Sequence, residues 1–232
     1  MTDRELLRLH LEAVWRISLP ALDGSSAELP ASGALPPWSL YHAQFTHDTV
    51  TLWRPAVAPE RRVNLLEQAQ RAGDAFDPAL GMRREVVLRS PGALVMERPA
   101  LPTPQTSVRL LGADDAPLLE AFEAESAPYF LDREHAPCIG VIVEGGLVSV
   151  AHSSRRTTAA CELGINTTPD ARRRGYATAA TLAWTQAIRQ EGLLPIYSAF
   201  AYNSASLRLA ARVGYSPAIA GVYGPVSAAD VT

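Results

Sequence analysis

Three consecutive arginines, Arg172 to Arg174, stand directly before Gly175 and the small-residue run Ala177-Thr-Ala-Ala. The pattern predicts a helix that begins at about Gly175. The first turn of a helix carries N–H groups without intrahelical partners and a partial positive charge, so it binds anions. Glycine lets the backbone approach an anion closely, and arginine adds paired donors for phosphate oxygens. A solvated basic turn would place positive charge unfavourably at a helix start, so the segment predicts a phosphate or pyrophosphate site.

Two common phosphate-binding loops are excluded by composition. The P-loop ends in glycine-lysine-serine or glycine-lysine-threonine, and the sequence contains no lysine. The dinucleotide fingerprint needs three spaced glycines, whereas this segment has Gly175 alone. A different type of phosphate loop is therefore expected.

A second chemical group, Glu162, lies in the apolar segment "AACELGINT" (159–167), which predicts a strand. A partly desolvated carboxylate can take the proton of an attacking amine, directly or through water. The alternatives are a surface glutamate or one paired with Arg155 or Arg156. His152 is another candidate base, although a hydrogen-bonded structural histidine is the favoured interpretation.

The loop and its upstream strand resemble those of GCN5-related N-acetyltransferases (GNAT). Arg172-Arg-Arg-Gly-Tyr-Ala177 matches the signature Gln/Arg-x-x-Gly-x-Gly/Ala, which cradles the pyrophosphate of coenzyme A in that family. Upstream, "CELGINTTP" is similar to the family's fourth strand, with Glu162 ten residues before Arg172.

Downstream, "YNSASLRLAARVGY" resembles the family's Asn-x-x-Ser/Ala helix that closes in glycine and an aromatic residue. Asn203, Ser206, Gly214 and Tyr215 fall in register. The resemblance covers about 107–232 and leaves the first hundred residues outside it.

The resemblance implies a site for acetyl-CoA as co-substrate. Backbone N–H groups of Arg174 to Thr178 would bind the pyrophosphate, and the arginines would reach it or the 3′-phosphate. A bulge at Gly164 to Asn166 would splay two strands and expose backbone groups to the pantetheine arm. Asn203 would contact that arm, cap its own helix, or do both. The implied coenzyme A contacts are Gly164, Ile165, Asn166, Thr167, Arg172, Arg173, Arg174, Gly175, Tyr176, Ala177, Thr178, Asn203 and Ser206.

The resemblance also implies direct transfer of an acetyl group to a primary amine. Glu162 would be the base, and the Ile165 N–H would polarise the thioester carbonyl. Many relatives carry a tyrosine, as the acid for the departing thiolate, at the position that is Ala210 here. The acid is left open among Tyr197, Tyr202, Tyr215, Tyr223 and solvent. This departure keeps an alternative function, a non-catalytic acyl-CoA-binding or regulatory module on the same fold.

The order of the helices and strands that would position these residues predicts an α/β (α+β) domain with a GNAT-like mixed, mostly antiparallel twisted sheet flanked by helices. Strands are expected at 107–112, 159–167 and 194–200, with helices at 113–125, 175–190 and 203–214. Asp114 or Asp115 is the expected N-cap of the first helix. A hairpin over 137–154 would turn at Gly145-Gly146, and 215–226 would supply one or two closing strands.

Residues 1–100 predict a smaller α+β lobe of unknown role, joined to 107–232 by the proline-rich segment "RPALPTPQTS" (98–107). Helices are expected at 3–16 and 59–72 and strands at 49–54 and 85–96.

The composition limits which classes of partner and which cellular compartment are expected for the protein. A net charge of −3 provides no global field for nucleic acid or anionic membrane, and a short basic turn makes few phosphate contacts. No apolar run approaches the roughly 20 residues of a membrane span. The start of the chain lacks signal-peptide features, and Cys138 and Cys161 lie in apolar stretches as reduced core residues, so a cytoplasmic protein is expected. The histidines lack metal-ligand spacing, and no metal is expected. The expected partner is a small-molecule or peptide amine, with a homodimer possible.

Overall fold

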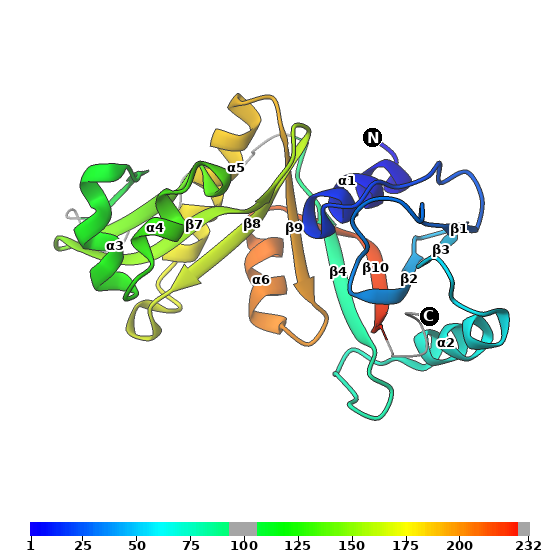
Figure 1. Ribbon diagram of the computed structural model, residues 1–232. Helices are drawn as coiled ribbons and strands as arrows, with labels where there is room; N and C mark the ends of the chain where they lie inside the picture. Colours follow the sequence, from blue (N-terminus) through cyan, green and yellow to red (C-terminus); the bar gives the residue numbers. More distant parts are fainter. Residues whose placement is uncertain (93–105, 227–232) are drawn as a thin grey trace. The chain divides into compact units, whose positions relative to one another are not determined.

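The computed structural model describes residues 1–92 and 106–226. Its contacts divide the chain into two compact units (Figure 1). The first unit contains Met1–Arg89, Ser198–Leu207 and the described residues from Ser216 onward. The second unit contains the described part of Ser90–Tyr197 together with Arg208–Tyr215.

The second unit is built on a mixed sheet with the strand order β9-β8-β7-β6-β5. Its neighbours from β5 to β8 are antiparallel, and β8 runs parallel to β9. This arrangement confirms the predicted fold class. The elements are β5 (Thr106–Leu110), α3 (Ala116–Phe122), α4 (Ala127–Leu131), β6 (Ile139–Val143), β7 (Gly146–Arg156), β8 (Ala160–Thr167), α5 (Tyr176–Gln190) and β9 (Leu194–Phe200).

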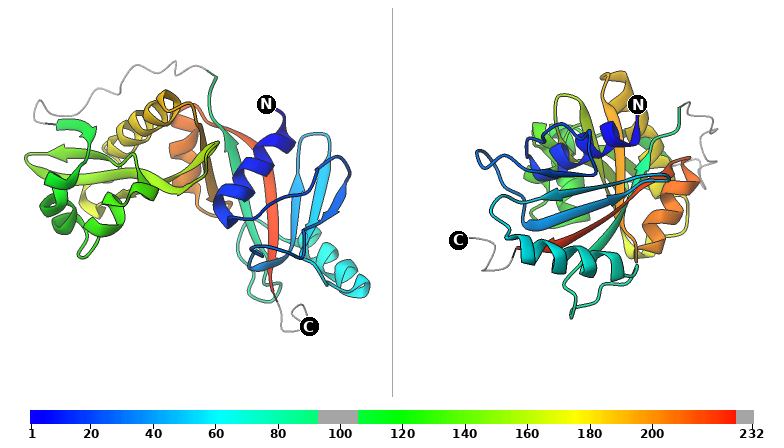
Figure 2. Two further views of the ribbon diagram at one scale, coloured as in Figure 1. Left: turned by 45° about the horizontal axis from the view of Figure 1, so that its top comes forward. Right: turned by 90° about the vertical axis from the view of Figure 1, so that its right-hand side faces the viewer.

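Helices cover both faces of this sheet. Successive residues of a strand point to opposite faces, and two neighbours on β7 show which helix covers which face. Ser153 accepts a hydrogen bond from Trp184 Nε1 of α5 (3.3 Å), whereas the ring of His152 packs against Phe130 of α4. Figure 2 shows α5 (gold) on the face opposite α3 and α4 (green). The sheet therefore presents one face to the long helix and the other to the two short helices.

The first unit is a five-stranded sheet in the order β1-β3-β2-β10-β4. Helix α1 begins with a capping box between Thr2 and Glu5. Trp15 of α1 packs edge-on against Tyr223 of β10, and Leu65 of α2 joins a core cluster with Leu40 and Val222. The elements are α1 (Asp3–Trp15), β1 (Ser26–Glu28), β2 (Trp38–Gln44), β3 (Thr49–Trp53), α2 (Pro59–Arg71), β4 (Arg83–Arg89) and β10 (Ser216–Pro225).

The predicted helices and strands agree with the observed ones to within three residues, except that β1, β2 and α4 were missed and that the strand expected at 85–96 is β4, which ends at Arg89. Residues 93–96 of that expected strand lie outside the described residues. The segment 215–226, expected to supply one or two strands, forms one strand, β10, which pairs with β2 and β4 of the first unit. Helix α6 (Ser204–Arg212) follows β9 and ends before Gly214 in the left-handed conformation, as predicted. Most of the predicted linker, 98–105, lies outside the described residues.

The hairpin between β6 and β7 corrects one prediction. Val143 pairs with Gly146, so the two turn residues are Glu144 (φ 51°) and Gly145 (φ 83°). Gly146 is the first residue of β7 and does not supply a positive φ. The length of the turn was predicted correctly, but its position is one residue earlier because Glu144 tolerates the left-handed conformation.

Asp115 is the N-cap residue of α3, but its side chain has another use. It forms an ion pair with Arg109 and accepts a hydrogen bond from the Gly112 N–H (2.9 Å), and it makes no cap hydrogen bond to α3. These bonds hold the pKa of Asp115 down at about 2, with the Arg109 bond as the main cause.

Within residues 1–92 and 106–226, no helix combines the length and apolar character needed to cross a bilayer.

Candidate functional site

Helix α5 begins directly after β8 and a short 3-10 turn, Pro169–Ala171. Gly175, in the left-handed conformation (φ 85°), is the residue before the helix. The first intrahelical bond runs from the Ala179 N–H to the Gly175 carbonyl (3.0 Å), so the N–H groups of residues 176–178 precede the hydrogen-bond ladder. Among the described residues, no side chain caps this helix. The start of α5 therefore offers open donors to an anion.

The surroundings of Gly175 leave room for that anion. A Cβ built at Gly175 would meet no atom within 4 Å, so the glycine is required by its φ angle and not by crowding. Arg172, Arg173 and Arg174 are all exposed, and Arg173 also adopts a left-handed φ of 62°. The predicted loop residues are thus brought together, and they fit a pyrophosphate.

The neighbouring strand β8 is paired on both edges only at its beginning. Its parallel pairing with β9 covers Ala160 to Glu162. The Thr168 N–H donates to the Val148 carbonyl of β7 (3.0 Å), and backbone groups in an antiparallel ladder alternate in direction. Gly164 and Asn166 therefore face β7, and the backbone groups of Ile165 face the opposite edge. The predicted role of the Ile165 N–H requires this orientation.

The expected bulge at Gly164 to Asn166 is not there. Residues 163–167 pair regularly with 149–153, and the irregularity lies in β7, where Ser154 is inserted between the pairs of Ser153 and Arg155. The Ser154 hydroxyl donates to the Glu162 carbonyl (3.2 Å) across this bulge. The bulge therefore bends the strand opposite Glu162 and does not lie in β8.

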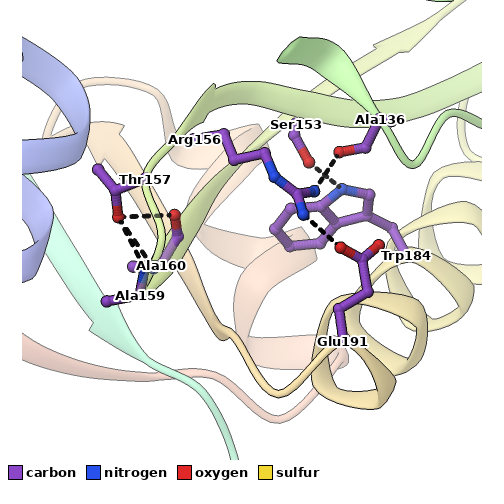
Figure 3. Close-up of polar contacts among 8 residues, drawn as sticks. All are labelled: Ala136, Ser153, Arg156, Thr157, Ala159, Ala160, Trp184 and Glu191. Carbon is purple, nitrogen blue, oxygen red and sulfur yellow. Dashed lines mark hydrogen bonds and ion pairs between the residues drawn. The ribbon is translucent and has the colours of Figure 1, made fainter. Parts of the chain in front are cut away.

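Glu162 is buried on β8 and forms an ion pair with Arg155 of β7 (3.8 Å between Arg155 Nη1 and Glu162 Oε2). Arg156 is engaged elsewhere: it forms an ion pair with Glu191 and donates to the Ala136 carbonyl (2.9 Å), as Figure 3 shows. Of the structural alternatives, pairing with Arg155 is therefore the observed one, and a surface position is wrong. The role of Glu162 as a base stays a prediction.

His152 lies on the α3–α4 face of β7, directly opposite Gly164. Its Nε2 is 3.2 Å from the Tyr129 hydroxyl, and its ring packs edge-on against Phe130. Burial, assisted by the nearby His135, lowers the pKa of His152 to about 4. The imidazole is therefore neutral at pH 7, in agreement with the favoured interpretation of a hydrogen-bonded buried histidine.

Comparison with known families decides the identity of this region. Residues 125–220 match the family model described as GNAT acetyltransferase. This region belongs to the GNAT superfamily. No curated protein matches the sequence.

Solved structures of GNAT proteins are similar to this chain at low sequence identity. A GNAT-family acetyltransferase from Colwellia psychrerythraea is 14% identical with a TM-score of 0.50, and the match covers 76% of each chain. A GCN5-related N-acetyltransferase from Kribbella flavida is 20% identical (TM-score 0.49), with 76% of this chain and 67% of that chain covered. A GCN5-related N-acetyltransferase-like protein from Streptococcus suis is 19% identical (TM-score 0.48), with 77% and 72% covered. The chain spans 66% of a GNAT-family structure from Novosphingobium aromaticivorans.

In the GNAT region, Asn203 caps α6. Its Oδ1 accepts a hydrogen bond from the Ser206 N–H (3.1 Å), and its carbonyl accepts one from the Leu207 N–H. Capping was one of the two predicted roles of Asn203. Contact with coenzyme A stays a prediction for both Asn203 and Ser206.

The position where many GNAT proteins carry a tyrosine, Ala210, is fully buried. Tyr215 is buried and within 3.0 Å of the Thr185 hydroxyl, and Tyr197 packs edge-on against Tyr215. Burial raises the pKa of Tyr215 far above its ordinary value. Tyr223 stacks on Tyr41 in the first unit. Three of the four candidate tyrosines are therefore held inside the protein, whereas Tyr202 is exposed.

Sequence reasoning missed Tyr129, which touches His152 from α4. Helix α4 is five residues long, too short to show a helical period, and it lies between the predicted helix at 113–125 and the predicted hairpin over 137–154. Both cysteines are free and buried, and burial raises the pKa of Cys138 to about 12. Within the described ranges, no group of three or more metal-ligating side chains could hold a metal ion.

Proposed function

We propose that the protein transfers an acetyl group from acetyl-CoA to a primary amine of a small molecule or peptide. The observation that carries this proposal is the start of α5, where open N–H donors and three exposed arginines surround Gly175 in the GNAT region. Helix N-termini of this kind bind phosphate groups through their N–H groups and dipole.

Each part of the site has a role in the proposed reaction. The N–H groups of residues 174–178 would bind the pyrophosphate and hold the thioester in place, which is a positioning role. The Ile165 N–H, on the edge of β8 opposite β7, would donate to the developing oxyanion. Glu162 would take the proton of the attacking amine. The coenzyme supplies the activated thioester.

Two observations favour a second candidate, a module on the same fold that binds acyl-CoA without turnover. Ala210 occupies the position of the family's tyrosine, and Glu162 is already in an ion pair with Arg155. The two functions separate in one measurement. Thiol release from acetyl-CoA is followed with spermidine, an alanyl peptide, lysine and kanamycin; coenzyme A binding without release in any of them favours the module.

A Gly175→Glu substitution tests the loop. It places a side chain and a negative charge where the pyrophosphate would lie, and we expect calorimetry to show at least 100-fold weaker binding of acetyl-CoA. Gly192→Glu is the matched control, because Gly192 also has a positive φ (77°) and open space around its Cβ position, at the other end of α5. Equal affinity of the two variants would refute the loop assignment.

A further inference from the structure

Tyr129 is held against His152 of strand β7 by aromatic neighbours. Its ring lies 3.9 Å from the ring of His135, measured between centroids, and packs edge-on against Phe130 and His152. His135 is itself fixed, since its Nδ1 lies 2.9 Å from the Ser153 carbonyl and donates to it. Tyr129 is nevertheless 45% exposed as a residue. A firmly positioned hydroxyl therefore has access to a ligand.

The His152 ring reaches from β7 to β8, and this places the Tyr129 hydroxyl. A Cβ built on Gly164 would lie 2.5 Å from His152 Nε2 and closer still to Cε1, so this tip of the ring rests on Gly164. The Tyr129 hydroxyl is 3.2 Å from the same Nε2. The His152 ring therefore links the Tyr129 hydroxyl to Gly164, the residue before Ile165, which is the predicted donor to the thioester carbonyl.

The second ring nitrogen of His152 decides the direction of this hydrogen bond. Nδ1 is buried and has no hydrogen-bond partner among the described residues. A neutral imidazole carries its proton on one nitrogen only. A buried N–H without an acceptor is rarer and costs more free energy than a buried acceptor nitrogen without a donor. The proton therefore belongs on Nε2, which donates to the Tyr129 oxygen. The Tyr129 O–H is then left to donate to something else.

We propose that Tyr129 is the general acid of the acyl transfer and that His152 positions it, a proposal that rests on the function proposed above. Tyr129 would take the role that Ala210 cannot perform. The donor comes from α4, on the face of the sheet opposite α5, and not from the helix that follows β9.

The proton balance of the step is simple. Glu162 takes a proton from the amine as its nitrogen attacks the carbonyl carbon. When the carbon–sulfur bond breaks, the electron pair stays on sulfur and the Tyr129 O–H proton moves to it. The resulting phenolate accepts the His152 Nε2–H bond, and the charge of Arg155 favours it against the burial that raises the pKa of Tyr129. Glu162 then gives its proton to solvent, and Tyr129 regains one.

The first test reads the tautomer and needs no acceptor. Long-range ¹H–¹⁵N NMR of the wild-type protein at pH 7, with His152 assigned from a His152→Gln sample, should show a neutral ring protonated on Nε2. A ring protonated on Nδ1 would make Tyr129 donate to His152 and would overturn the proposal, as would an imidazolium.

The second test reads thiol release from acetyl-CoA with water and with the amines named above. We expect Tyr129→Phe to lower kcat about 100-fold, within the usual range for a positioned acid, and to leave the Kd of acetyl-CoA within twofold. The glutamine amide reaches the place of Nε2, and that of asparagine reaches only the place of Nδ1. His152→Gln should therefore stay within tenfold of wild type, and His152→Asn should fall as Tyr129→Phe does.

The outcomes separate the two proposals. Equal kcat for wild type and Tyr129→Phe, or equal losses for His152→Gln and His152→Asn, would refute the role of Tyr129 and leave acetyl transfer standing. Failure of the wild-type protein to bind acetyl-CoA, or to release thiol with any acceptor, would overturn both.

Discussion

At the scale of single residues, Glu162 is a buried carboxylate whose ion-pair partner is exposed to solvent. Its side chain is only 9% exposed, yet its partner Arg155 is 47% exposed, so the pair sits at the boundary between the sheet and solvent. The 3.8 Å separation is longer than a direct hydrogen bond. An amine that approaches from the α3–α4 face would therefore meet a carboxylate that is oriented by an arginine.

This geometry predicts the effect of Glu162→Gln. The amide keeps the shape of the side chain but cannot accept a proton, so we expect kcat to fall about 100-fold while the Kd of acetyl-CoA changes less than twofold. Glu191→Gln is the matched control, because Glu191 forms an ion pair with Arg156, the residue next to Arg155. If both variants retain wild-type turnover, Glu162 is not the base.

The residues of the loop were predictable because their function lies in the backbone. A glycine with a positive φ at the start of a helix leaves a mark in the sequence, and Gly175 shows it. Tyr129 left no such mark, because its position depends on His135, in a short 3-10 helix, and on His152, which lies 23 residues away in β7. Contacts between side chains of separate elements are set by tertiary packing, which a single sequence does not show.

At the scale of elements, strands β7 and β8 pair at a position where the large side chain of His152 lies opposite a glycine, Gly164. Gly164 has no side chain, and the ring of His152 fills the space that a Cβ would take. The ring packs against Phe130 of α4, the pairing with β8 is regular from 163 to 167, and the bulge at Ser154 follows two residues after His152. The glycine is therefore required by the histidine and not by its own backbone angles.

Chemical denaturation of the Gly164→Ala variant tests whether the His152 ring needs the space at Gly164. The added methyl group must displace the ring, and overpacking of this kind costs about 1–3 kcal/mol of unfolding free energy. In a His152→Ala background the space is open, and the same substitution should cost less than about 0.5 kcal/mol, because alanine is otherwise favoured over glycine in a strand. Gly146→Ala, whose Cβ would make only ordinary contact, is the control. Equal costs in both backgrounds would contradict the argument.

The long elements were predictable from periodicity and the short ones were not. Helix α5 and strand β9 have uniform apolar patterns with clear ends, and their predicted bounds lie within one residue of the observed ones. Strand β2 was not predicted, because Pro36 and Pro37 directly before it are turn signals. The strand is stabilised by its partners β3 and β10. The pairing of β10 with β2 joins the two ends of the chain, which no local pattern reveals.

At the scale of the whole molecule, each unit contains a buried group whose charge state is set by folding. In the first unit, Glu85 accepts hydrogen bonds from Tyr41 (2.6 Å) and from His10 (2.9 Å). Burial raises the pKa of Glu85, but the charge and bond of His10 and the bond of Tyr41 outweigh it, and the pKa lies below the ordinary 4.5. In the second unit, burial lowers the pKa of His152 from 6.5 to about 4.

Both shifts remove stability in acid, over different ranges of pH. The unfolded chain protonates His152 below pH 6.5 while the folded chain does not until about pH 4, so stability falls between these values. Glu85 contributes stability above pH 4.5, and this is lost as the pH falls through its lower folded pKa. On acidification, the stabilising contribution of neutral His152 should therefore be lost before that of Glu85.

Urea denaturation at pH 7.5, 5.5, 4.5 and 3.5 checks this order, with two neutral variants as references. His152→Gln cannot titrate, so the loss of unfolding free energy between pH 6.5 and 4 should be shallower than in wild type, by up to about 1.4 kcal/mol per pH unit. His42, whose pKa is also lowered by burial, titrates in both proteins and cancels in the comparison. Glu85→Gln should follow the wild-type slope down to pH 4.5 and differ from it only below. Parallel curves for wild type and His152→Gln would show that His152 is not a buried neutral base, and the tautomer that orients Tyr129 would lose its physical basis.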